Sequence, residues 1–130
     1  MIKLFLRITG FMFASYGAYL YVNPQYLIDW IEIGESIPAK VEVRAMYGGL
    51  QLGFGLLLLW SAQRSQEQQQ MAYAVMIAVF AGLASARGLG MLIDGTDDYN
   101  QTAFFYESAS FLISVFAYWK LREQISSEAS

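Results

Sequence analysis

Four long apolar runs constrain this chain more than any other feature. The hydrocarbon core of a bilayer is about 30 Å thick, so a helix needs roughly 20 mostly apolar residues to cross it. Of the 130 residues, 56% are hydrophobic and 15% are charged, whereas about a quarter are charged in soluble domains. We therefore predict an all-α fold, a single transmembrane four-helix bundle domain over residues 1–130, with helices at about residues 4–22, 44–61, 71–93 and 102–120.

The segments between these runs predict an orientation. Asn23-Pro24 ends the first run, because proline lacks a backbone donor and disfavours helix in the preceding residue. The stretch YLIDWIEI is expected to lie flat at the membrane interface, and SAQRSQEQQQ and DGTDDYNQ are predicted turns. Acidic residues dominate the segments 23–43 and 94–101, and basic residues collect on the other side. The positive-inside rule then places both termini in the cytoplasm, on the side of Lys3, Arg7, Arg64, Lys120 and Arg122.

Composition excludes several kinds of chemistry. The chain has no cysteine and no histidine, which removes disulfides, thiolate or imidazole metal sites and Ser-His-Asp triads. A net charge of −3 gives no basic surface for nucleic acid. We predict no cofactor, no metal and no catalytic residue, and the sequence leans away from an enzyme.

Small residues recur every four positions and predict where helices pack, because close backbone approach drives association in lipid. The third run has the most regular ladder, so we expect it to pack most tightly. The positions predicted to make helix contacts include Gly49, Gly53, Ala78, Gly82, Ala86 and Gly90.

Charged side chains inside the runs form the candidate site. Arg87 and Glu107 lie deepest, and a charge near the bilayer centre costs roughly 2.5–3.5 kcal/mol on insertion scales, so the two are expected to face the interior and pair. Arg44 is expected to pair with Asp94 or Glu42. Helical spacing and depth bring together the predicted cluster of Glu42, Arg44, Tyr47, Gln51, Arg87, Asp94 and Glu107.

Several blocks of the sequence resemble the bacterial domain-of-unknown-function 4345 family. The longest is the run from Glu42 to Gly53, EVRAMYGGLQLG, whose first part, EVRAMYGG, is the most specific; shorter matches are ARGLG, from Ala86 to Gly90, and Asp94-Gly95. That family looks like small four-helix proteins of the bacterial inner membrane, loosely similar to the DoxX group. The resemblance implies a multi-pass protein of the inner (cytoplasmic) membrane and no activity; the matching positions are Glu42, Arg44, Tyr47, Gly48, Gly49, Arg87, Asp94 and Glu107.

Two functional hypotheses are equally supported by the sequence. In one, the cluster lines a pocket for a small amphipathic or anionic ligand such as a lipid, with Arg44 and Arg87 favouring a carboxylate or phosphate head. In the other, the charges only fix helix register and the protein is an accessory or scaffolding subunit that binds other membrane proteins or itself. Acid–base catalysis or ion movement through Asp94 and Glu107 carries less weight.

Overall fold

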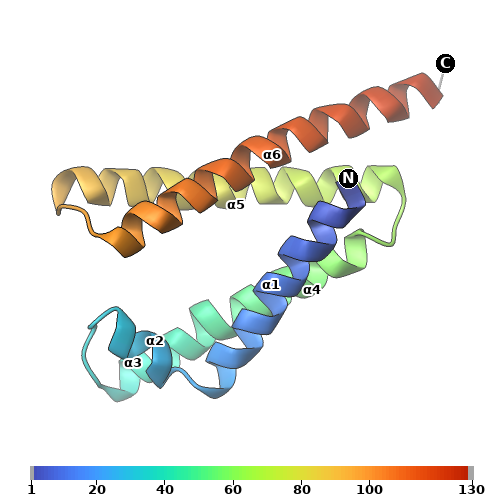
Figure 1. Ribbon diagram of the computed structural model, residues 1–130. Coiled ribbons are helices and arrows are strands. Elements are labelled where there is room, and N and C mark those ends of the chain that lie inside the picture. The colour runs from blue at the N-terminus through green and yellow to red at the C-terminus, as the bar shows by residue number, and fades with distance from the viewer. Residues whose placement is uncertain (1, 129–130) are drawn as a thin grey trace. The chain divides into compact units, whose positions relative to one another are not determined.

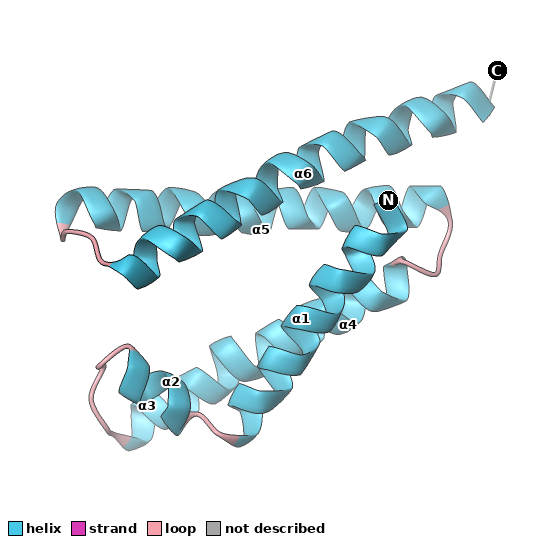
Figure 2. Ribbon diagram, in the orientation of Figure 1, coloured by secondary structure: helices cyan, strands magenta, loops and turns pink. Residues whose placement is uncertain are grey.

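The computed structural model describes residues 2–128, and every regular element within them is helical (Figure 2). The predicted all-α class is therefore confirmed. The chain divides into two compact units between Arg64 and Ser65, and each is built on long helices that pack side by side (Figure 1). The elements are α1 (Ile2–Val22), α2 (Gln25–Trp30), α3 (Ile37–Glu42), the π-helical segment η1 (Val43–Gly49), α4 (Leu50–Ser61), α5 (Gln66–Ile93) and α6 (Asp98–Glu128).

The helices begin earlier than the apolar runs predict, because capping side chains start them in polar sequence. Ser65 accepts a hydrogen bond from the backbone N–H of Gln68 at 3.4 Å, so the glutamines expected in a turn form the first turns of α5. Ser36 caps α3 in the same way, through the N–H of Ala39 at 3.2 Å. The second helix therefore starts at Ile37 and runs through η1 into α4.

Two helical stretches are long and apolar enough to cross a membrane, namely Ile37–Ser61 and Gln66–Ile93. Within the described part of the chain α1 and α6 do not reach the same standard. Polar side chains, such as Arg7 in α1 and Glu107 in α6, dilute their apolar character. Membrane crossing stays a prediction for all four helices.

Glycines hold α1 against η1 and α4 in the first unit. A Cβ added to Gly17 would lie 2.8 Å from the carbonyl oxygen of Gly48, and one added to Gly55 would lie 2.6 Å from the carbonyl oxygen of Gly10. Gly49 and Gly53, also predicted to make helix contacts, have no such close neighbour within this unit. The first meets only the carbonyl oxygen of Arg44 at 3.6 Å, and the second meets nothing within 4 Å.

The second unit packs α5 on α6 through large side chains rather than through the small-residue ladder. Ala78, Gly82 and Ala86 are exposed, and a Cβ added to Gly82 or Gly90 would meet nothing within 4 Å. The ladder therefore does not make the α5–α6 contact, and its packing against another helix stays a prediction. The buried residues of α5 lie on its opposite face, and the buried side chains of the two helices include Tyr73, Met76, Phe80, Ser110, Ser114 and Ala117.

Candidate functional site

Arg87 joins α5 to α6 through a bidentate ion pair. Its Nε donates to Oε2 of Glu107 at 2.9 Å and its Nη2 donates to Oε1 at 2.7 Å. Glu107 is 5% exposed, so the two N–H donors of Arg87 replace water as hydrogen-bond partners of its carboxylate. The structure thus confirms the predicted pairing of the two deepest charges.

The same guanidinium also reaches the start of α6. Its Nη1 donates to Oδ1 of Asn100 at 2.7 Å, and its Cζ lies 5.7 Å from the ring centre of Tyr99. Arg87 therefore has hydrogen-bond partners about two turns apart on α6. This holds the guanidinium in one orientation.

Asp97 fixes Asn100 in its turn. The Oδ1 of Asp97 accepts from the backbone N–H of Asn100 at 2.9 Å, and its Oδ2 accepts from the Asn100 side-chain amide at 2.6 Å. These hydrogen bonds, with a smaller contribution from the positive charge of Arg87, lower the pKa of Asp97 below its ordinary value. A polar chain thus runs Asp97–Asn100–Arg87–Glu107 across the end of the α5–α6 pair.

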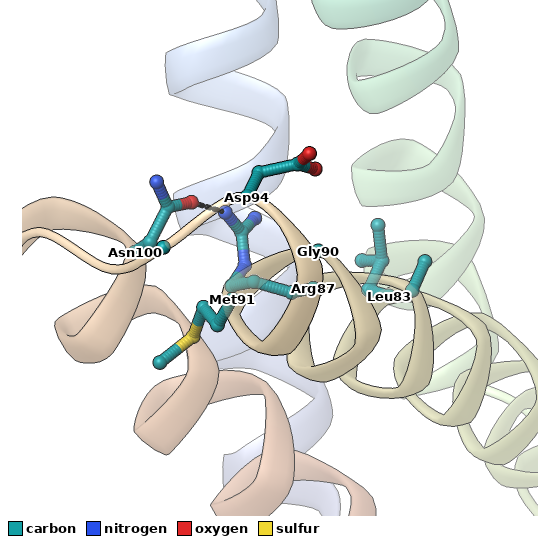
Figure 3. A pocket seen from close by; sticks show the side chains of 8 residues that line it. Leu83, Arg87, Gly90, Met91, Asp94 and Asn100 are labelled. Carbon is teal, nitrogen blue, oxygen red and sulfur yellow. Dashed lines mark hydrogen bonds between the residues drawn. The ribbon is translucent and has the colours of Figure 1, made fainter.

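An open pocket of about 360 Å³ lies beside this chain. Figure 3 shows Arg87, Asp94 and Asn100 toward one end and Leu83 toward the other. The lining combines charged and amide side chains with apolar ones, a combination typical of sites for small ligands. The lining residues are Leu83, Ala86, Arg87, Gly90, Met91, Asp94, Gly95 and Asn100.

Four of the predicted site residues lie in the first unit. Glu42 ends α3, Arg44 and Tyr47 belong to η1, and Gln51 follows in α4. Arg44 donates from its Nε to the carbonyl oxygen of Tyr21 at 3.3 Å, so its expected pairing with Glu42 is wrong: two positions apart on a helix, the side chains do not face each other. Its pairing with Asp94 stays a prediction.

The π-helical conformation of η1 is a feature that the sequence reasoning missed. π-helical turns are rare and occur frequently at functional sites. The segment coincides with the block VRAMYGG, which we had treated as ordinary α-helix. Gly48 within it packs against the backbone of Tyr21, with only 2.8 Å from an added Cβ to the Tyr21 Cα. No periodicity in the sequence signals this change of helix type.

Asn100 and Tyr99 are the other site residues that were missed. Both fall in DGTDDYNQ, which reads as a turn. A usable signal was present, because an aspartate three residues before an asparagine has the spacing of a helix N-cap. That spacing places Asn100 in the first turn of a helix, at a height where Arg87 can reach it.

Comparison with known proteins agrees with the sequence resemblance. A family model described as "Domain of unknown function (DUF4345)" matches residues 1–118. No curated protein matches the chain, and no solved structure does. The match covers both helical units except the last turns of α6. The chain therefore belongs to the DUF4345 family.

Proposed function

We propose that this protein is a non-enzymatic, multi-pass protein of the bacterial inner membrane, and that its α5–α6 pocket binds a small amphipathic ligand. In the membrane its helices form a four-helix bundle with both termini in the cytoplasm. Lipid as the solvent is supported by the large apolar side chains that the two units expose, such as Leu92 at 86% and Ile37 at 81%. In water such exposure would be costly.

The observation that carries the binding proposal is the lining of the pocket, which includes both polar and apolar side chains. Arg87, Asp94 and Asn100 supply charged and amide groups, whereas Leu83, Ala86 and Met91 supply apolar surface. Its volume of about 360 Å³ falls within the range of about 300–1,000 Å³ found for small-molecule sites. A ligand with a polar head and a short apolar tail matches both kinds of side chain.

An accessory role in a larger membrane assembly is the second candidate, and one observation favours it. The small side chains of Ala78, Gly82 and Ala86 are exposed along α5, where another helix could approach the backbone closely. A pull-down in mild detergent from the native host tests this role. Recovery of this chain without a stoichiometric partner would count against it.

A filled pocket tests the binding proposal. A Cβ added to Gly90 meets nothing within 4 Å, so Gly90→Leu should occupy the pocket without straining the fold. Gly82→Leu is the matched control, because Gly82 has equal space on the same helix but does not line the pocket. The probes are three six-carbon amphiphiles, hexylammonium, hexanol and hexanoate, titrated calorimetrically into protein in zwitterionic lipid nanodiscs, with empty nanodiscs subtracted.

The expected result is saturable heat from at least one probe with the wild-type protein and with Gly82→Leu, and none with Gly90→Leu. Binding that survives in Gly90→Leu would place the ligand elsewhere and overturn the proposal. So would the absence of saturable heat from all three probes with the wild-type protein.

A further inference from the structure

We infer that the α5–α6 pocket selects an amphiphile with a cationic head, of the alkylammonium class, over one with an anionic head. This inference rests on the proposed function and adds to it the charge of the ligand. It reverses the expectation, drawn from two arginines in the sequence, that a carboxylate or phosphate would bind. Three features of the pocket carry it.

The first feature is the balance of charge. From Leu83 to Glu107 the chain carries one basic residue, Arg87, and four acidic ones, a net formal charge of −3; the acidic residues are Asp94, Asp97, Asp98 and Glu107. Arg44, the second arginine of the anion hypothesis, lies in the other unit and donates to the Tyr21 carbonyl. The potential around the pocket therefore attracts cations and repels anions.

The second feature is the state of Arg87. All three of its nitrogens already donate to the protein, two to Glu107 and one to Asn100. A bidentate guanidinium–carboxylate pair is among the strongest polar contacts in proteins. One N–H on each terminal nitrogen is left for a ligand, but an anionic head held there would lie close to the buried Glu107 carboxylate, whose negative charge would repel it.

The third feature is Asp94, the carboxylate that remains for a ligand. Its side chain lines the pocket, and among residues 2–128 it forms no hydrogen bond or ion pair with the protein. Asp94 also caps the C-terminus of α5, with its N–H bound to the Gly90 carbonyl at 2.8 Å. The negative end of the helix dipole therefore adds to its charge at the place where the head would lie.

An organic cation fits this site better than a metal ion does. The described residues contain no group of three or more acidic side chains placed to hold a metal. An ammonium head needs only one carboxylate, and its alkyl chain can contact the apolar lining residues Leu83 and Ala86. Gly90 keeps the floor of the pocket open, so the chain can approach the α5 backbone between Leu83 and Met91.

The test compares the three six-carbon probes on the same nanodisc samples. Hexylammonium should bind the wild-type protein most tightly, hexanol more weakly and hexanoate least. In Asp94→Asn the affinity for hexylammonium should fall by about two- to fivefold, as expected for one partly exposed charge pair, while the affinity for hexanol stays the same. Asp98→Asn is the control, since it removes the same charge from a residue that does not line the pocket and should change affinity by less than about twofold.

The outcomes separate this inference from the proposed function. If hexanol or hexanoate binds as tightly as hexylammonium, and Gly90→Leu abolishes that binding, the pocket is real and the cation preference is wrong. If Asp98→Asn weakens hexylammonium as much as Asp94→Asn does, the carboxylate assignment is wrong. If no probe gives saturable heat, the proposed function fails and the inference fails with it.

Discussion

At the scale of single residues, the pair of Arg87 and Glu107 decides whether α5 and α6 stay together. The Glu107 carboxylate is almost fully buried and its two oxygens both accept from one guanidinium. Removing one partner of a buried pair leaves the other charge without compensation, which costs about 3–5 kcal/mol. Arg87→Ala should therefore lower the free energy of unfolding by that amount, measured by thermal or denaturant unfolding in a mild detergent.

A double variant shows whether the loss of stability comes from the unpaired charge that a single substitution leaves behind. Replacing both partners by apolar residues of similar size is often neutral, so Arg87→Met combined with Glu107→Leu should recover most of the stability that Arg87→Ala loses. An unchanged unfolding midpoint in Arg87→Ala would show that the ion pair does not stabilise the hairpin of α5 and α6.

This pair was predictable from sequence because the physics leaves few alternatives. Two opposite charges deep in apolar runs must find each other or face lipid. The contact of Arg87 with Asn100 was not predictable in the same way, since it depends on how Asp97 orients the asparagine. The charge of the pocket likewise depends on which of its groups are already paired, and only coordinates give that.

At the scale of elements, the small-residue ladders predicted that helices pack closely through glycines, but not which helices do so. Close glycine packing does occur, between α1 and the η1–α4 stretch, at Gly10, Gly17, Gly48 and Gly55. The most regular ladder, on α5, faces away from α6. A period of four marks one face of a helix, but it does not say which neighbour that face meets. Bulky side chains on the opposite face of α5 fill more space against small serines, and they decide the contact.

Two glycines on α4 provide a matched test of this packing. A Cβ on Gly55 would come within 2.6–2.8 Å of the backbone of α1, at Gly10 and Ala14, whereas a Cβ on Gly53 would meet nothing within 4 Å. Gly55→Ala should therefore destabilise the first unit by about 1–3 kcal/mol through overpacking. Gly53→Ala should be neutral or stabilise it by up to about 1 kcal/mol through helix propensity.

Thermal unfolding followed by circular dichroism measures both variants under the same conditions. Similar midpoints for Gly55→Ala and the wild-type protein would mean that α1 and α4 do not approach each other as closely as the structure has them. A large loss in Gly53→Ala would reveal a contact of that face outside α1.

At the scale of the whole molecule, composition and run length predicted the all-α class and the EVRAMYGG block indicated the family, but neither predicted the division into two units. Four apolar runs of similar length suggest four equivalent helices. The structure instead pairs α1 with α4 and α5 with α6, because glycine contacts join the first pair and the charged cluster with its aromatic core joins the second. A short connection joins α5 to α6, whereas α2, α3 and η1 lie between α1 and α4, so chain order favours only the second pair.

The absence of cysteine from the sequence makes the proposed topology directly testable, since any introduced thiol is unique. With both termini in the cytoplasm, the connection between α5 and α6 faces outward and the connection between α4 and α5 faces inward. Thr96→Cys should therefore react with a membrane-impermeant maleimide added to intact cells, and Ser65→Cys should react only after the membrane is permeabilised. Both positions are exposed in the structure, so a difference in labelling reports the side of the membrane rather than burial.

Labelling of Ser65→Cys alone in intact cells would show the opposite orientation, with the pocket and its excess of carboxylates at the cytoplasmic face. Equal labelling of both before permeabilisation would contradict the proposal that α5 crosses the membrane at all.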